Sequence, residues 1–450
     1  MAGNWSRAAL DSLVVDVLDR RGVTVRKLRS DFVAVGHRVI SAKLIKSGRI
    51  DLGADEPRFV DEPTYARWMR TALLPDDVIL TSEAPLGEVA YIDAQLDWCL
   101  GQRLFAIRTN KRLLNGRYLY YALQSDSVRQ DLFSRATGTT VFGIRQAELR
   151  RIEVPLPPLD EQRAISRILG TLDDKIELNR RMNETLEAIA RALFKSWFVD
   201  FDPVRAKSEG RDPGLPPHLA DLFPDSFEDS ELGEIPAGWR VLTLSECVDV
   251  DRGLSYKGSG LSDSGMPMHN LNSIYEGGGY KREGIKYYEG DFKPHHLVRA
   301  GDLIVANTEQ GHKRRLIGYA ALVPGRIRDE GLFSHHLFRV RPRGSSELTP
   351  EYLCNLLNTE VMHDTVSGFA NGTTVNMLPV AGLRNPLVVE PPSGIVKVFN
   401  GVAEAARQRH ETLMDESRTL TGLRDTLLPK LLSGELRLKD TERFAAGVGP

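Results

Sequence analysis

The chain contains the same segment twice at a constant spacing, and this repeat constrains its fold more than any other feature. The six residues Ala136 to Val141 read ATGTTV, and Ala370 to Val375 read ANGTTV. A gapless correspondence at the same offset joins residues 117–158 to residues 351–392. Self-similarity at a fixed offset indicates that one structural unit occurs twice. The sequence therefore predicts two similar folded modules.

The composition is that of a chain with several folded domains. A length of 450 residues favours about three domains, and 41% hydrophobic residues can fill more than one core. Cys99, Cys247 and Cys354 lie far apart without a CxxC pattern, which argues against a disulfide framework or a zinc site and fits a reducing compartment. No apolar run approaches the roughly 20 residues needed to cross a bilayer, and the N-terminal residues include acids, so we expect a cytoplasmic protein.

Each module combines short β-type runs with turns rich in glycine and proline. Asp77 to Thr81 and Arg103 to Ile107 are such runs in the first module, and Asp302 to Val305 and His336 to Arg341 match them in the second. The offset between these pairs slips by several residues, as expected where loops have accepted insertions. We expect an α/β (α+β) fold with two similar modules of mixed sheet and helices.

A long amphipathic stretch follows each module. Pro157-Pro158 halts the first module, Asp160 can cap a helix, and apolar residues then recur three or four positions apart. Because the two stretches carry equal apolar seams, we expect two long antiparallel helices that form a coiled coil, in a pseudo-twofold internal repeat. Pro429 should bend or end the second helix. The residues predicted to pair the helices are Ile165, Leu169, Leu172, Ile176, Leu186, Leu193, Val398, Val402, Leu413, Leu420 and Leu427.

These patterns predict a division of the chain into six segments. The segment rich in Pro, Asp, Glu and Gly between the first helix and the second module is expected to be an extended connector. The predicted boundaries are a first module at 1–155, a central helix at 156–200, the connector at 201–238, a second module at 239–392, a C-terminal helix at 393–440 and a tail at 441–450.

Two modules on a stiff support suit the reading of two separated sites on duplex DNA. The formal net charge of −2 provides no overall basic footprint, so local basic groups would have to neutralise phosphates. The repeated Gly-Thr-Thr can equally bond phosphates or bases, or only cap a turn, whereas for any single basic residue a solvated loop is the preferred interpretation. The planar groups of Arg145 and Asn376 suit base-edge readout. The candidate DNA-binding residues are Lys43, Lys46, Arg49, Thr139, Thr140, Arg145, Lys281, Arg282, Lys313, Arg314, Arg315, Thr373, Thr374 and Asn376.

A search for catalytic motifs finds none in the sequence. The segment Gly253 to Gly258 is followed by Ser259 where a phosphate-binding loop would have lysine, which excludes an ATP-cradling loop there. Glu83 is followed by Pro85 where a nuclease carboxylate cluster would have lysine. We therefore predict neither catalytic residues nor a metal site.

Histidine and proline pairs also lack a catalytic setting. His295-His296 and His335-His336 are expected to point to opposite faces of a strand, and no carboxylate stands at a suitable spacing for metal binding. The two proline pairs lack the preceding Asn or Asp and the following aromatic residue with which an adenine methyltransferase grips a flipped base.

Three segments resemble a known family. Residues 155–207, which begin PLPPLDEQRAISRILG, closely resemble the central conserved region of type I restriction-modification specificity subunits. LLPKLLSGELRL at 427–438 is similar to the C-terminal conserved region of that family, and DVILTSEAPLGEVA at 77–90 is similar to a phrase of its first target-recognition domain.

The resemblance implies a non-catalytic recognition subunit of a multi-subunit restriction endonuclease and adenine-N6 methyltransferase. Each module would read one half of a bipartite double-stranded DNA site, and the paired helices would set the spacing and dock two methylation subunits. Those subunits would bring S-adenosylmethionine, and motor-nuclease restriction subunits would use ATP and magnesium, so no cofactor is expected on this chain. Two alternatives remain: a specificity chain with its own degenerate nuclease or methyltransferase activity, and a coiled-coil protein-interaction scaffold.

The chain departs from the family pattern at two places. The second copy has Pro391-Pro392-Ser393-Gly394 and so loses the Asp-Glu-Gln of the first, which leaves the start of its helix open. The first module is expected to lack an equivalent of Gly238-Trp239, which leaves its N-terminal boundary open.

Overall fold

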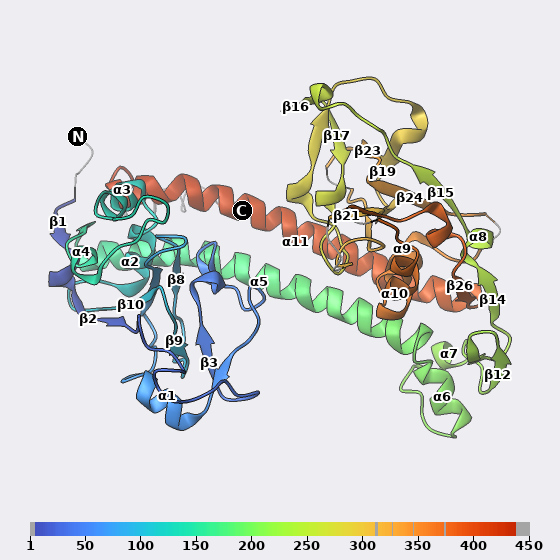
Figure 1. The fold of residues 1–450 in the computed structure, drawn as a ribbon, viewed down its shortest axis with the longest axis horizontal. Coiled ribbons are helices and arrows are strands. Elements are labelled where there is room, and N and C mark those ends of the chain that lie inside the picture. The colour runs from blue at the N-terminus through green and yellow to red at the C-terminus, as the bar shows by residue number, and fades with distance from the viewer. Residues whose placement is uncertain (1–4, 311–313, 326, 345, 373–374, 438–450) are drawn as a thin grey trace, which may run out of the picture. The chain divides into compact units, whose positions relative to one another are not determined.

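The computed structural model describes residues 5–310, 314–325, 327–344, 346–372 and 375–437. The chain divides into two compact units, Met1–Leu178 with Glu416–Pro450, and Asn179–Asp415. Each unit contains one module and part of each long helix (Figure 1). Among the predicted features, Lys313, Thr373, Thr374 and the tail at 441–450 lie outside the described residues.

The first module is built on a four-stranded sheet of order β2-β10-β7-β8, with a three-stranded sheet β6-β3-β9 and short helices around it. Its core strand β7 carries the β-branched and aliphatic sequence VILT and is buried on both faces. Its elements are β1 (Arg7–Ala9), η1 (Leu10–Leu13), β2 (Val14–Asp19), β3 (His37–Ile40), η2 (Ala42–Leu44), β4 (Ile45–Lys46), β5 (Arg49–Ile50), β6 (Phe59–Val60), α1 (Glu62–Trp68), β7 (Val78–Thr81), β8 (Val89–Tyr91), β9 (Cys99–Leu100), β10 (Leu104–Thr109), α2 (Gly116–Ala122), α3 (Asp126–Ser134), α4 (Gln146–Leu149) and β11 (Glu153–Pro155).

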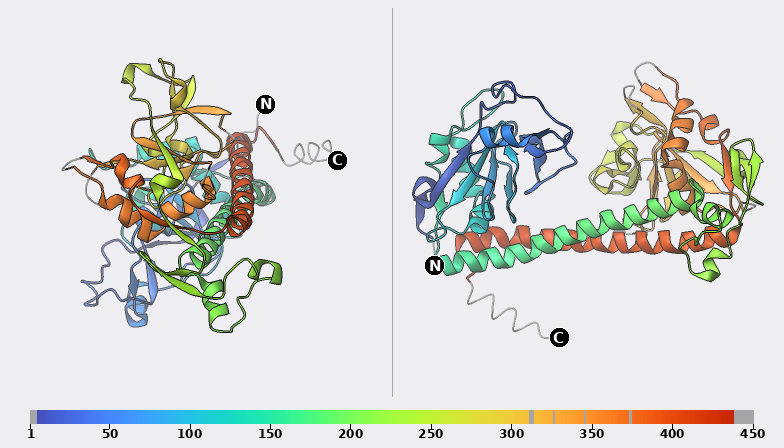
Figure 2. Two further views of the ribbon diagram at one scale, coloured as in Figure 1. Left: turned by 90° about the vertical axis from the view of Figure 1, so that its right-hand side faces the viewer. Right: turned by 90° about the horizontal axis from the view of Figure 1, so that it is seen from below.

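The second module repeats this plan with a four-stranded sheet of order β15-β24-β20-β22 and a five-stranded sheet β16-β18-β17-β23-β19 (Figure 2). Its elements are β14 (Arg240–Thr243), α8 (Leu244–Cys247), β15 (Val248–Arg252), η3 (Gly258–Gly260), β16 (Leu261–Ser262), β17 (Met266–His269), η4 (Leu271–Ser273), η5 (Arg282–Gly284), β18 (Lys286–Tyr288), η6 (Pro294–His296), β19 (Leu297–Arg299), β20 (Leu303–Ala306), β21 (Thr308–Gln310), β22 (Ala320–Leu322), β23 (Glu330–Phe333), β24 (Leu337–Pro342), α9 (Pro350–Leu357), α10 (Glu360–Gly368), β25 (Val375–Met377), η7 (Val380–Leu383) and β26 (Leu387–Glu390).

The two modules agree in strand register as well as in strand order. β1 pairs with β11 through Ala8 opposite Val154, and β14 pairs with β26 through Leu242 opposite Val388. The separation from Ala8 to Leu242, and that from Val154 to Val388, equals the offset between Ala136 and Ala370. Helix caps agree too: the side chain of Asn115 accepts a hydrogen bond at the start of α2, and Thr349 does so at the start of α9. The predicted repeat of two similar modules is therefore confirmed at the level of hydrogen bonds.

The predicted long helices are both present and begin at matched positions. α5 runs from Leu159–Phe198 and α11 from Ser393–Ser433. In each unit a part of α5 lies antiparallel beside a part of α11, as Figures 1 and 2 show. The loss of the Asp-Glu-Gln sequence in the second copy does not displace the start of α11, and Val396 is buried as its counterpart Gln162 is in the first copy.

One prediction about the helix ends was wrong, and one of the two alternatives for Pro429 is excluded. Asp160 lies in the first turn of α5 rather than at its cap, and its side chain is 94% exposed. Pro429 does not end α11, which continues to Ser433. Leu431 and Leu432 beyond the proline are buried in the core of the first unit, and this packing stabilises the last turn although the proline lacks an N–H group.

The prediction of an extended connector at 201–238 was also wrong. This stretch forms α6 (Asp202–Ser208), α7 (Pro217–Ala220) and a hairpin of β12 (Phe227–Ser230) and β13 (Gly233–Pro236). Three of its apolar residues, Val204, Phe223 and Ile235, are buried in the core of the second unit. The prediction rested on the high content of Pro, Asp, Glu and Gly and did not take these buried apolar residues into account.

The first module does have a counterpart of the tryptophan that opens the second. Trp5 corresponds to Trp239 at the offset of the repeat, and each precedes the first strand of its module, β1 or β14. The prediction was therefore wrong for the tryptophan, whereas the position of Gly238 is occupied by Asn4 in the sequence. Within the described ranges, no helix is long and apolar enough to span a membrane.

Candidate nucleic-acid interface

The first copy of the repeated Gly-Thr-Thr sequence forms the tip of a hairpin, and the second copy begins in a hairpin that is closed at the matching positions. Thr137 and Gly143 close the first hairpin with two backbone hydrogen bonds of 2.8 and 2.9 Å, and Asn371 and Met377 close the second with bonds of 3.0 and 2.8 Å. Gly138 and Gly372 have φ values of +126° and +143°. A Cβ at either glycine would lie 2.1 Å from the carbonyl oxygen three residues later. Both hairpins therefore require glycine at this position.

The described residues of the hairpin tips face solvent. Thr139 and Thr140 are exposed, and the Val141 and Phe142 side chains are 51% and 52% exposed. Arg145, predicted for base-edge readout, is exposed beside the first hairpin. Asn376, the other residue predicted for that role, is only 8% exposed and pairs through its backbone with Glu309. Because the Asn376 side chain is buried, it is not accessible to a base edge.

Lys43 and Lys46 of the first module line one shallow pocket. Its other walls include Ala84, Pro85 and Glu88 from the turn between β7 and β8. The Lys43 Nζ lies 3.6 Å from Asp55, and its side chain is 70% exposed. Lys46 is exposed, and no ion pair of Lys46 occurs in the described part of the chain. Of the predicted cations, these two meet at one surface.

The third predicted cation of this region lies apart from the pocket walls. The Arg49 guanidinium is 4.0 Å from Asp51, and both side chains are partly exposed. This distance is at the limit of an ion pair, so the pair contributes little, as is usual at surfaces. The Arg49 guanidinium is therefore little neutralised by Asp51 and can still attract a phosphate.

In the second module an exposed basic loop follows β21. Arg314 and Arg315 are exposed, and the Arg315 guanidinium lies 3.6 Å from Glu276. The buried Glu309 carboxylate accepts hydrogen bonds from the backbone N–H groups of residues 315–317 at 3.0 to 3.2 Å. Because these bonds hold the loop backbone, the two arginines are presented on a fixed support.

Of the predicted pair Lys281 and Arg282, the arginine is turned toward the long helix instead. Arg282 Nη1 lies 2.9 Å from the Asp415 carboxylate of α11, and the arginine side chain is only 17% exposed. Lys281 Nζ lies 5.8 Å from the centre of the Tyr275 ring, at the distance of a cation–π contact. Arg282 therefore joins the module to α11, a role that the sequence did not reveal.

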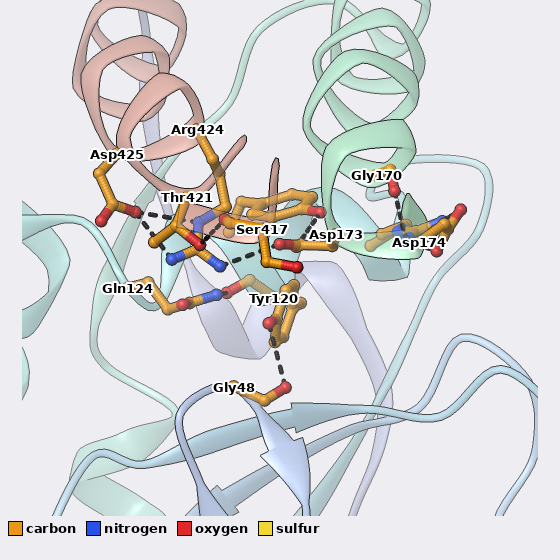
Figure 3. A network of polar contacts seen from close by, with 12 residues as sticks. Gly48, Tyr120, Gln124, Gly170, Asp173, Asp174, Ser417, Thr421, Arg424 and Asp425 are labelled. Carbon is orange, nitrogen blue, oxygen red and sulfur yellow. Dashed lines mark hydrogen bonds and ion pairs between the residues drawn. The ribbon is translucent and has the colours of Figure 1, made fainter. Parts of the chain in front are cut away.

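In the first unit the helices and the module meet at Asp173 (Figure 3). The Tyr121 hydroxyl of α2 donates to Asp173 at 2.6 Å, and Arg424 of α11 donates to the other carboxylate oxygen at 2.9 Å. Burial and the Asp173 carboxylate raise the pKa of Tyr121. Burial lowers the pKa of Arg424, but its hydrogen bonds to Asp173 and Asp425 outweigh this and raise it overall. One carboxylate thus links α2, α5 and α11.

Two further contacts position α5 in the first unit. The buried Gln162 side chain accepts from the N–H of Asn115 at 2.9 Å and donates to the carbonyls of Leu113 and Pro157. Arg117 bonds both Asp174 and the carbonyl of Gly170. The first turns of α5 are therefore fixed to the module by hydrogen bonds as well as by packing.

In the second unit an aromatic cluster joins the helices. Phe194 and Phe198 of α5 have ring centres 5.4 Å from Phe399 of α11, and both lie about as close to Tyr352 of α9, at 5.1 and 4.9 Å. Such edge-on contacts add to the free energy gained by burying the rings. In the first unit the positions of Phe399 and Phe198 are occupied by Ile165 and Leu432, which are also buried.

Polar groups also join α5 and α11 in the second unit. The fully buried Asn179 amide donates to the carbonyl of Leu413 at 3.5 Å. Glu187 lies 3.3 Å from His410, and this hydrogen bond holds the pKa of the Glu187 carboxyl below its usual range. In this unit α5 and α11 are therefore joined by one buried and one partly exposed polar contact beside the apolar ones.

The residues of the predicted seam differ in burial. Among its residues, Ile165, Leu169 and Leu413 are buried, and Val402 is 41% exposed and lies outside the seam. Its neighbours Phe399 and Ala403 face the core instead. The buried face of α11 is therefore adjacent to the one that the spacing of apolar residues predicted. The remaining predicted seam residues are partly buried: Leu172, Ile176, Leu186, Leu193, Val398, Leu420 and Leu427.

The histidine pairs do not stand as predicted. His335-His336 lie in a turn between β23 and β24, and His295-His296 lie in η6, so neither pair is on a strand. Searched over the described residues, the structure contains no group of three or more His, Cys, Asp or Glu side chains that could hold a metal ion.

Comparisons with known proteins agree with this architecture. Residues 71–188 match the family model of the type I restriction modification DNA specificity domain. The type I restriction enzyme MjaIX specificity subunit of Methanocaldococcus jannaschii is 25% identical over 386 residues, covering 81% of this chain and 78% of that protein. The HindI specificity subunit of Haemophilus influenzae is 23% identical over 429 residues, covering 82% and 88%.

The chain thus contains a match to this specificity domain and is similar over about four fifths of its length to type I restriction enzyme specificity subunits. The crystal structure of the S subunit of such a system from M. genitalium is similar in fold, with a TM-score of 0.57 at 17% identity and coverage of 95% of this chain and 96% of that one. The two chains thus share a fold over nearly the whole length of each.

Proposed function

We propose that this chain is the non-catalytic DNA-specificity subunit of a type I restriction-modification complex, in which each module reads one half of a bipartite site. The observation that carries the proposal is that two modules of equal strand order and register present different exposed groups. Lys43 and Lys46 line the pocket of the first, whereas Arg314 and Arg315 occupy the basic loop of the second. Equal scaffolds with different surface chemistry suit two different half-sites.

Methylome sequencing tests this proposal. A host that expresses the chain with its methylation subunits should carry methylated adenines in one motif with two specified halves and an unspecified gap. A host that expresses the methylation subunits alone is the control and should lack that motif. Methylation without a bipartite motif would contradict the proposal.

The paired helices are proposed to set the distance between the half-sites and to dock the methylation subunits. Exposed apolar side chains on α5 and α11 support docking, since Leu178, Ile189, Val402 and Leu423 are 41% to 52% exposed. Because the helices pair antiparallel, one heptad should be inserted in both, after Met182 and after Leu413. This adds about 10 Å, or about 3 base pairs of spacer. An unchanged spacer would contradict the role of the helices.

The chemistry is proposed to reside on partner subunits in the cytoplasm. Methylation subunits would bind S-adenosylmethionine, and restriction subunits would use ATP and magnesium. The isolated chain should then show neither methyl transfer nor DNA cleavage when S-adenosylmethionine or magnesium is added. Activity that co-purifies with the isolated chain and is lost in a variant of that chain would favour an autonomous enzyme.

A further inference from the structure

The segment that connects β2 to β3 in the first module is strongly basic. Residues 20–36 contain five Arg or Lys residues and one acid, Asp31. The second module has a matching connection between β15 and β17, because β17 pairs in parallel with β23 just as β3 pairs with β9. That connection, residues 253–265, contains one lysine and one acid. The basic character of this connection is therefore a property of the first module only.

Three of the five cations lie on a backbone turn that is fixed to the rest of the module. Three backbone hydrogen bonds of 3.0 to 3.1 Å close the turn at residues 24–30. Arg67 of α1 donates to one of its carbonyls at 2.9 Å. In the described ranges, no ion pair or side-chain hydrogen bond engages its exposed cations Arg26, Lys27 and Arg29. Their charges are therefore available to an anionic partner.

Apolar side chains are exposed directly after this turn. Val35 is 86% exposed, and Phe32 is 46% exposed. The backbone between them is held in place, since the N–H of Val33 donates to the carbonyl of Phe59 in β6 at 2.9 Å. Apolar groups that a fixed backbone presents to solvent side by side indicate an interaction site.

This apolar loop continues into the pocket that Lys43 and Lys46 line. The carboxylate of Asp55 lies 3.6 Å from the Nζ of Lys43 and 3.9 Å from the guanidinium of Arg58. That guanidinium lies over the Phe32 ring, 5.9 Å from the ring centre. Successive contacts thus connect Lys43, Arg58 and Phe32. The pocket and the loop therefore belong to one surface.

Duplex DNA suits this surface better than a protein partner does. Cations that lack ion pairs are suited to phosphates, whereas exposed apolar groups by themselves would also suit a protein. In the major groove the apolar groups of DNA are the thymine methyls. Because the Arg58 guanidinium lies over one face of the Phe32 ring, the ring suits a contact along the groove rather than insertion between base pairs.

We propose that the first module binds the DNA of its half-site with Arg26, Lys27, Arg29, Phe32 and Val35. The three cations bind phosphates, and Phe32 and Val35 contact thymine methyl groups in the major groove. The sequence patterns indicated none of these five residues. The matching connection of the second module lacks them, so the contacts are made at one half-site only. This inference deepens the proposed function and rests on it, because it requires that the modules bind DNA.

The test of the cations uses the full chain assembled with its methylation subunits and a duplex that carries the methylated bipartite motif. The variant R26Q/K27Q/R29Q removes three charges and keeps polar side chains. The slope of log affinity against log salt concentration should become shallower by about two to three, at roughly 0.9 for each phosphate contact. Binding to specific and to unrelated duplexes should weaken alike. R26K/R29K is the matched control, because it keeps the charges and should keep the slope.

Uracil substitution tests the apolar contacts, because uracil lacks only the methyl group of thymine. Each thymine of the duplex is replaced in turn. The complex of the unsubstituted chain should lose affinity about fourfold at a thymine of one half-site, as expected for one buried methyl group. F32A/V35A should be insensitive at that thymine. V361A is the matched control, since it truncates a valine that is 71% exposed on α10, and it should keep the sensitivity.

The outcomes separate this inference from the proposed function. An unchanged salt slope in R26Q/K27Q/R29Q, or a uracil sensitivity that is absent from the unsubstituted chain or persists in F32A/V35A, overturns the inference while the bipartite motif is still methylated. Loss of the methylation subunits from either variant overturns it too, because the surface would then bind protein. If the unsubstituted complex prefers no bipartite site, the proposed function fails and the inference fails with it.

Discussion

Replacing Asp173 with alanine should destabilise the first unit far more than the same change at its neighbour Asp174. Asp173 accepts from the Tyr121 hydroxyl at 2.6 Å and from Arg424 at 2.9 Å. Its removal leaves the Tyr121 hydroxyl without this acceptor in a residue that is 1% exposed, at a cost of about 1–3 kcal/mol. Arg424 loses one carboxylate but keeps Asp425. We expect a total loss of roughly 2–4 kcal/mol.

Asp174 provides the control because it differs mainly in exposure. Its side chain is 67% exposed and pairs with Arg117, so D174A should cost about 0–1 kcal/mol, as for surface ion pairs. The assay is hydrogen exchange of peptides that cover α2 at increasing urea concentrations, which reports the first unit alone. Each variant gives a free energy of opening for comparison with the unsubstituted chain.

A double mutant isolates the buried contact. In the D173A/Y121F variant no unpaired hydroxyl remains, so the destabilisation should be smaller than the sum of the two single changes by about 1–3 kcal/mol. Equal effects of D173A and D174A, or additive effects of D173A and Y121F, would refute the assignment of Asp173 as the junction of α2, α5 and α11.

Three further results are expected. G138A should change hydrogen exchange only around the first hairpin, because a Cβ would meet the Val141 carbonyl at 2.1 Å; global unfolding or no change would contradict this. Burial lowers the pKa of His269 to about 4, so the folded state disfavours its protonation and stability is lost as pH falls from about 6.5 toward 4. In urea unfolding, the unsubstituted chain should therefore lose about 2 kcal/mol relative to H269Q between pH 7.5 and 5. Parallel pH profiles of the two chains would refute this. F399A should destabilise the second unit by about 3–5 kcal/mol in calorimetry, and a loss under about 1 kcal/mol would show that the aromatic cluster is not its core.

The repeat made much of the architecture predictable. Strands such as Asp77 to Thr81 were recognised because β-branched residues lie between clear turns, and the structure places β7 there. The matched starts of α5 and α11 follow from the constant offset between the two copies. By contrast, the folded connector depends on isolated anchors such as Val204 and Phe223, whose burial no local period indicates.

The contacts that join modules to helices could not be predicted from local sequence. Asp173 and Arg424 are 251 residues apart, and only the folded chain brings them together. Asn179 is fully buried beside α11, although a polar residue of an amphipathic helix is expected to face solvent. Arg282 reads as a surface cation until its partner Asp415 is known. The Trp5 equivalence, in contrast, was visible in the constant offset and was missed.

Exchange of one module tests the central claim most directly. Residues 239–392 would be replaced by the corresponding module of another specificity subunit, and the methylome of the host would be sequenced before and after. The account predicts that one half of the methylated motif changes while the other half and the gap between them stay the same. A change in both halves, or in neither, would contradict it.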